Sequence, residues 1–165
     1  MNSRPFLALL AGIATASAAG LAIAQGSAPP ADAPSTPQTV LGPGLYVFQT
    51  RITAATCGDA DRTGDVTSYY AAIDGIPGSR QMRMGLLNSR FWPSWTLNVT
   101  ANDHVVGDAD QEGVTGPHRG HSHFDVGPDN GRFTGQGTRE YSRQVGTETA
   151  RCRVTYDALL KRIDR

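Results

Sequence analysis

The chain has 165 residues, and its 15 basic and 15 acidic side chains give a formal net charge of zero. No excess of positive charge is present to attract nucleic acid or an anionic membrane, so we expect no nucleic-acid partner. The length that follows the N-terminal segments described next is typical of a single domain.

The first 24 residues have the composition of a signal peptide. Arg4 is followed by a run of small and apolar residues that ends in Ala22-Ile23-Ala24, so we expect cleavage before Gln25. The most apolar part, Phe6 to Ala14, is too short to cross a bilayer alone. We therefore predict a periplasmic or secreted protein whose mature chain has no transmembrane segment.

Residues 25–42 contain four prolines and no apolar periodicity, which indicates a disordered or semi-extended Pro/Ala-rich linker. A single β domain is predicted over residues 43–165. Its first strand is expected from Leu45 to Cys57, with Tyr46, Phe48, Thr50, Ile52 and Ala54 on the buried face. Cys57 falls on the opposite face of that strand, so we expect a bulge or turn before it.

Alternating apolar residues predict several more strands: Val66–Asp74, Arg80–Asn88, Trp95–Thr100, His104–Gly107, Arg132–Ser142 and Gly146–Ala158. Gly107 to Gly131 is almost free of apolar residues and is expected to be a long loop. Ala158 to Ile163 is expected to form a short helix or to fray. The predicted fold is all-β, a small antiparallel β-sandwich or barrel.

The chain has two cysteines, Cys57 and Cys152, and no C-x-x-C motif. Cys152 lies on the apolar face of the last strand, together with Val154 and Tyr156. This arrangement favours one structural disulfide formed in an oxidising compartment. We therefore expect a bridge between Cys57 and Cys152 that makes the first and last strands neighbours.

Three histidines and an aspartate lie close together, at His118, His121, His123 and Asp125. In an extended segment the last three would project on one side, where two imidazoles and a carboxylate could bind Zn²⁺ or Cu²⁺. The alternative is a polar loop with solvated histidines, because spacing alone is not specific.

Two short segments share the pattern Gly-Asp-Ala-Asp, beginning at Gly58 and at Gly107. The pattern could open a calcium loop, but Tyr70 and Arg119 stand where the closing glutamate is needed. We expect both segments to be turns capped by aspartate.

The segment Phe91-Trp92-Pro93 is expected either to form an exposed aromatic loop tip, suited to binding, or to fold over the core as a lid. Five charged residues near the C-terminus are expected to pair across strands on a solvated face. They are Arg139, Glu140, Arg143, Arg151 and Arg153.

The sequence contains no nucleophile elbow, P-loop or dinucleotide fingerprint. We therefore expect a non-enzymatic exported domain, without a cofactor, that binds a protein, an envelope component or a small apolar ligand. Phe91 and Trp92 are the candidate binding surface. The alternative is a metal-binding protein or metal-dependent enzyme that uses the histidine segment.

Overall fold

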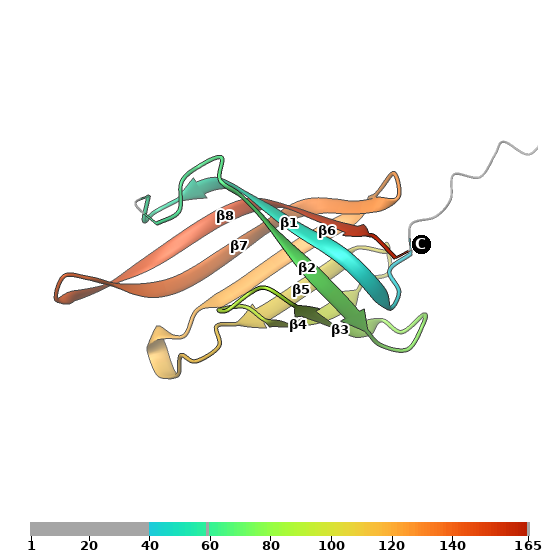
Figure 1. Ribbon diagram of the computed structural model, residues 1–165, viewed down its shortest axis with the longest axis horizontal. Helices are drawn as coiled ribbons and strands as arrows, with labels where there is room; N and C mark the ends of the chain where they lie inside the picture. Colours follow the sequence, from blue (N-terminus) through green and yellow to red (C-terminus); the bar gives the residue numbers. More distant parts are fainter. Residues whose placement is uncertain (1–39, 59, 165) are drawn as a thin grey trace, which may run out of the picture. The chain divides into compact units, whose positions relative to one another are not determined.

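The computed structural model describes residues 40–58 and 60–164, so the predicted signal peptide and most of the linker lie outside the described residues. The described chain is all-β and forms a closed barrel of eight antiparallel strands (Figure 1). The strands are β1 (Gly44–Ala55), β2 (Val66–Asp74), β3 (Gln81–Leu86), β4 (Ser94–Val99), β5 (Val105–Asp110), β6 (His121–Asp129), β7 (Arg132–Val145) and β8 (Glu148–Arg162). No helix among the described residues is long and apolar enough to span a membrane.

Each strand pairs with the next, and β1 pairs with β8 to close the barrel. The expected neighbourhood of the first and last strands is thus confirmed, and the fold is a barrel rather than a sandwich. Tyr46, Phe48, Thr50 and Ile52 are buried as predicted. The pairing of β1 with β8 shifts register between Ile52 and Ala54. This irregularity is the expected bulge before Cys57, and beyond it Ala54 is exposed rather than buried.

The long loop predicted between Gly107 and Gly131 was wrong, because most of it belongs to β5 and β6. These two strands need few large apolar residues, because the ring of Phe124 in β6 occupies the space that a Cβ atom on Gly107 in β5 would take. Phe124 and Val126 are the large apolar residues that β6 directs inward. The outward positions of β6 are polar, so the apolar pattern was too sparse to detect.

The short helix or frayed end expected at Ala158 to Ile163 was also wrong. β8 continues to Arg162, and the inward alternation of Tyr156 and Ala158 extends to Leu160, which is fully buried. Gly135 and Gly137 mark close approaches between the backbones of β7 and β6. A Cβ atom on Gly137 would lie 2.5 Å from the carbonyl oxygen of His123, so a larger residue would not fit.

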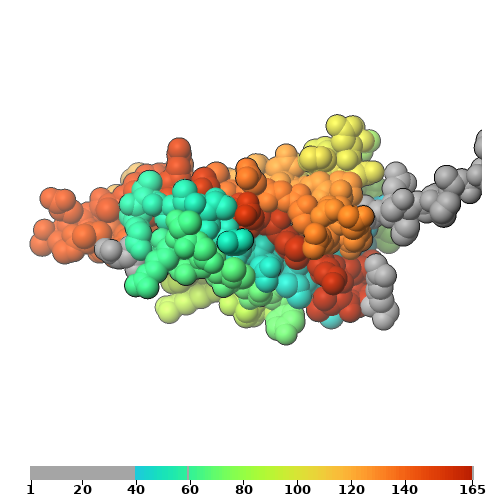
Figure 2. Space-filling view, turned by 90° about the horizontal axis from the view of Figure 1, so that it is seen from above, coloured from blue at the N-terminus to red at the C-terminus, as the bar shows by residue number. Residues whose placement is uncertain are grey.

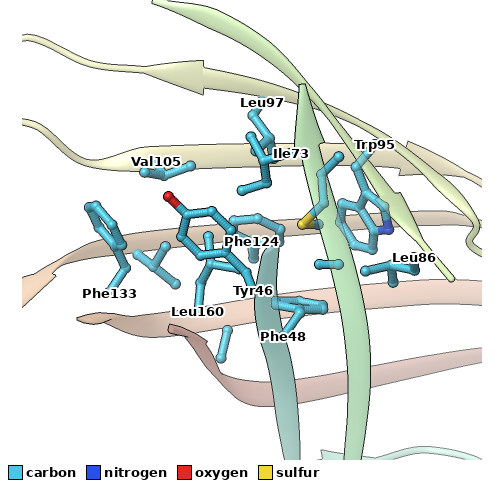
Figure 3. Close-up of a cluster of buried hydrophobic side chains, with 14 of the residues drawn as sticks. Tyr46, Phe48, Ile73, Leu86, Trp95, Leu97, Val105, Phe124, Phe133 and Leu160 are labelled. Atoms are coloured by element: carbon cyan, nitrogen blue, oxygen red, sulfur yellow. The ribbon is translucent and has the colours of Figure 1, made fainter. Parts of the chain in front are cut away.

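Large apolar side chains from all eight strands fill the barrel (Figure 3). One end, which we call the closed end, is plugged by Leu41 and Tyr46, and the Tyr46 hydroxyl donates to the carbonyl oxygen of Gly42 at 2.8 Å. Leu41 was assigned to the linker, yet its side chain is only 3% exposed and packs in the core. The barrel domain therefore includes it.

The opposite end, which we call the mouth, carries the loops at residues 56–65, 87–93 and 111–120. The β7–β8 hairpin projects beyond these loops at the left of Figures 1 and 2. Beside it, Cys57 and Cys152 form the predicted disulfide, with their Cα atoms 5.4 Å apart. The amides of Ala60 and Asp61 both donate to the carbonyl oxygen of Cys57, so the disulfide anchors the loop that carries Asp61.

Candidate functional site

The mouth contains a cavity of about 600 Å³. Its walls come from segments far apart in sequence: the β1–β2 loop, the start of β2, the β3–β4 loop and the inward face of β7. Four aromatic side chains line it, namely Tyr69, Phe91, Trp92 and Tyr141. Its size is within the range of pockets that enclose small molecules.

The two aromatic residues of the predicted loop tip have different roles. Phe91 is 53% exposed at the rim of the mouth, as a binding tip would be. Trp92 is only 7% exposed and belongs to the core, so it acts as the lid that the alternative prediction described. The carbonyl oxygen of Trp92 accepts a hydrogen bond from Nε1 of Trp95 at 3.0 Å, which fixes this lid to β4.

An ion pair crosses the mouth from the β1–β2 loop to β7. Nη2 of Arg139 donates to Oδ1 of Asp61 at 2.8 Å, and the side chains are only 17% and 12% exposed. The hydroxyl of Tyr141 donates to the other carboxylate oxygen, Oδ2. Burial, reinforced by this hydrogen bond to Asp61, raises the pKa of Tyr141 from 10 to about 12. The tyrosine therefore stays protonated at neutral pH and keeps donating to Asp61.

These contacts correct the prediction for Arg139 and Arg143, which we expected on a solvated face. Arg139, Tyr141 and Arg143 lie at every second position of β7 and line the mouth. Glu140, on the opposite face, behaves as predicted. Its carboxylate accepts from Nε of Arg153 at 2.7 Å and from Nη2 of Arg151 at 3.1 Å. The hydrogen bond from Arg153 is the largest influence that lowers the pKa of Glu140, followed by the one from Arg151.

Below the mouth a few polar side chains lie among the apolar core, and the barrel interior is almost full. The hydroxyl of Tyr156 lies 3.1 Å from Oγ of Ser122 and donates to the carbonyl oxygen of His123 at 3.0 Å. Burial raises the pKa of Tyr156 to about 12. The space left between Arg139, Ser122 and Tyr156 measures about 10 Å³, room for about one water molecule. The free volume therefore lies in the mouth and not deeper in the barrel.

The predicted metal-binding residues are only partly brought together. His121, His123 and Asp125 do project on one side, the outer face of β6. Asp125 pairs with Nδ1 of His104 at 2.9 Å. His118 lies outside the strand, exposed in a 3₁₀ turn at Gly116–His118.

The two histidines of β6, His121 and His123, pair with aspartates of β5. Nδ1 of His121 lies 3.1 Å from Oδ1 of Asp110, and Nδ1 of His123 lies 2.8 Å from Oδ1 of Asp108. These aspartates belong to a strand, so the turn predicted after Gly107 was wrong. In the part of the chain that the structure describes, no group of three or more His, Cys, Asp or Glu side chains is arranged to hold a metal ion.

A second cavity, of about 710 Å³, lies on the outer surface of strands β3 to β6. Its lining includes charged side chains such as Asp74, Arg83, Asp110 and Arg119. Asp110 and Arg119 already pair with each other at 3.2 Å. The charges there therefore partly satisfy one another, and exposed aromatic side chains such as Phe91 belong to the mouth instead.

Sequence reasoning identified Phe91 and Trp92 but missed Asp61, Arg139 and Tyr141 as parts of one site. The alternation of β7 places Arg139 and Tyr141 on the same face as the buried Phe133. This was the signal in the sequence that could have assigned the two residues to the inside of the barrel. Nothing in the local sequence of the β1–β2 loop points to β7. No family model matches this chain, and no curated protein or solved structure was found to be similar to it.

Proposed function

We propose that this protein is an exported, non-enzymatic binding protein that takes a small, largely apolar ligand at the mouth of its barrel. The cavity of about 600 Å³, with Phe91 exposed at its rim, is the observation that supports this proposal. An eight-stranded barrel has room for its own side chains or for one small ligand. Here the side chains occupy the closed end, and the free volume is at the mouth.

The aromatic lining favours a small molecule over a protein partner or an envelope component. Phe91 and Tyr69 reach the cavity from β3–β4 and β2, while Tyr141 reaches it from β7 across the mouth. An apolar molecule between these rings would lose water contact on more than one side. A protein partner would instead need a broad, continuous surface.

The proposed export also has support in the described chain. The disulfide between Cys57 and Cys152 is compatible with an oxidising compartment, either the periplasm or the exterior. Mass spectrometry of the protein recovered from that compartment should give an N-terminus at Gln25 and an oxidised cysteine pair. A mature chain that still begins at Met1 would contradict this part of the proposal.

The ligand site can be tested with the neutral fluorescent probe phenylnaphthylamine. Both tryptophans of the chain, Trp92 and Trp95, lie in the core beside the mouth, so a bound probe should quench their emission. Replacing Phe91 with alanine should weaken binding about tenfold, since one wall of the site is lost.

The matched control is Ile76→Ala. Ile76 is another exposed apolar residue, but it lies in the β2–β3 turn at the closed end. Its replacement should leave the affinity unchanged. Absence of saturable binding, or equal losses in the two variants, would exclude the mouth as the ligand site.

Metal binding by the histidine segment is the second candidate. Oδ1 of Asp108 lies 2.8 Å from Nδ1 of His123 and 3.4 Å from Nε2 of His121, so one carboxylate oxygen already faces two imidazoles. We rank it second because no described cluster of three ligands is arranged for a metal. A rise in melting temperature with Zn²⁺ or Cu²⁺ that is lost in His121→Ala/His123→Ala would support this candidate instead.

A further inference from the structure

We infer that the ligand of the mouth carries an anionic group, such as a carboxylate or a sulfonate, which Arg139 and Arg143 bind while its apolar part packs against Phe91. This inference rests on the proposed function and names the chemical class of the ligand. It follows from how the charges in the mouth are used.

Among the residues that the structure describes, the lining of the mouth contains three arginines, Arg90, Arg139 and Arg143, and one carboxylate, that of Asp61. Both oxygens of that carboxylate are already occupied, one by Nη2 of Arg139 and the other by the hydroxyl of Tyr141. Asp61 is therefore not available to a cationic ligand. Within this described lining, the positive charge exceeds the negative charge by two.

Arg139 keeps hydrogen-bonding capacity for a ligand. Within residues 40–58 and 60–164, the guanidinium of Arg139 makes one hydrogen bond, from Nη2 to Asp61. A guanidinium has five N–H donors, so Nε and Nη1 can still donate. The side chain of Arg139 is mostly buried. Its guanidinium is held in place by Asp61 and by the ring of Tyr141, whose centroid lies 5.9 Å from Cζ of Arg139. A positioned guanidinium of this kind suits a planar, bidentate anion.

Arg143 provides a second cation on the same inward face of β7, four residues after Arg139 and with Tyr141 between them. Four residues correspond to about 13 Å along a strand, so both guanidiniums reach one anionic group when the two long side chains lean towards each other over Tyr141. No ion pair joins Arg143 to a described carboxylate. Arg90 stacks on Phe91, with Cζ 5.7 Å from the ring centroid, so a cation also lies beside the apolar wall.

Two probes with the same aromatic skeleton separate this inference from the proposed function. Anilinonaphthalene sulfonate carries one negative charge, and phenylnaphthylamine is its uncharged counterpart. The protein should bind the sulfonate at least about tenfold more tightly at low ionic strength, and this preference should shrink as salt is added.

Three variants test whether the arginines of the mouth cause the preference for the sulfonate over the neutral probe. Arg143→Gln should weaken sulfonate binding about tenfold and change phenylnaphthylamine binding less than about twofold. Arg80→Gln, a matched change at the closed end, should alter neither affinity. Asp61→Asn should strengthen sulfonate binding relative to the neutral probe, since it removes the negative charge that competes for Arg139.

The outcomes distinguish the two ideas. If both probes bind equally in the wild-type protein, or if Arg143→Gln and Asp61→Asn leave the preference unchanged, the anionic class is wrong and the mouth remains a site for neutral apolar ligands. If neither probe binds, or if Phe91→Ala affects neither, the proposed function itself fails.

Discussion

Asp61 and Arg139 are 78 positions apart in sequence, yet Nη2 of Arg139 donates to Oδ1 of Asp61 at 2.8 Å across the mouth of the barrel. This contact joins a loop anchored by the disulfide to the inward face of β7. It also occupies the carboxylate of Asp61, the one acidic group that the described residues contribute to the lining of the mouth.

Removing the acid of this pair should destabilise the protein. Asp61→Asn leaves the mostly buried guanidinium of Arg139 without its counter-ion, and we expect a loss of about 3 kcal/mol in the free energy of unfolding. Urea denaturation at neutral pH measures it. Asp129→Asn is the control, because Asp129 pairs with Arg132 at 3.1 Å on the surface and should cost less than about 1 kcal/mol. Equal losses in the two variants would show that the Asp61–Arg139 pair contributes no more to stability than an exposed ion pair.

Neighbouring aromatic residues should respond differently to truncation. Trp92→Ala removes a buried ring and should lower the free energy of unfolding by about 3–5 kcal/mol. Phe91→Ala changes a side chain that is 53% exposed and should stay within about 0.5 kcal/mol of the wild type. Thermal or chemical denaturation of the two variants checks both values. A neutral Trp92→Ala would place this ring outside the core.

The disulfide should contribute to stability and to the mouth. Its cysteines are 95 positions apart, and replacing both with serine should lower the free energy of unfolding by about 2–5 kcal/mol. The same change releases the loop that carries Asp61, so binding of the anionic probe should also change. Urea denaturation of the oxidised wild type, the reduced wild type and the double variant provides the comparison. Identical midpoints for all three would contradict the prediction.

Alkaline pH should reveal the two buried tyrosines. The pKa values of Tyr141 and Tyr156 are both raised from 10 to about 12, mainly by burial. In the unfolded chain these groups lose their protons near pH 10, while the folded protein retains them up to about pH 12. The free energy of unfolding is therefore unaffected below pH 10 and falls as the pH rises from 10 towards 12. For Tyr156, the more deeply buried, the loss is on the order of 2–3 kcal/mol.

Tyrosinate absorbance followed against pH measures these ionisations. Tyr156→Phe should remove one late ionisation and leave that of Tyr141 in place. Tyr70, which is exposed, provides the matched control as Tyr70→Phe. Ionisation of Tyr141 and Tyr156 near pH 10 would contradict the burial of these two residues.

Much of the fold followed from local patterns. The β-class, the bulge before Cys57, and the pairing of Cys57 with Cys152 were all evident in the alternation of apolar residues and in the cysteine count. These features depend on which face of a strand a side chain occupies, and that is set by neighbours one or two positions away. The cross-strand pairing of Glu140 with Arg151 and Arg153 was predicted on the same basis.

The remaining features depended on contacts between distant segments. β6 was missed because the ring of its Phe124 fills the space beside Gly107 of β5, where a larger side chain on β5 would otherwise be needed. This contact joins two strands, so the sequence of either strand alone does not reveal it. Closure into a barrel required β1 to pair with β8 along their length. A sandwich with the same disulfide would show the same local alternation.

The proposed binding site also combines features that local sequence determines with features that depend on the tertiary structure. The sequence by itself determined that Phe91 and Trp92 would lie between two strands and that Arg139 and Tyr141 would share a face of β7. Only the tertiary structure decided that this face turns into the mouth, that Trp92 is buried while Phe91 is exposed, and that Asp61 meets Arg139. The physical reason is that barrel closure brings loops and strands together across the mouth, and alternation along one strand carries no information about that closure.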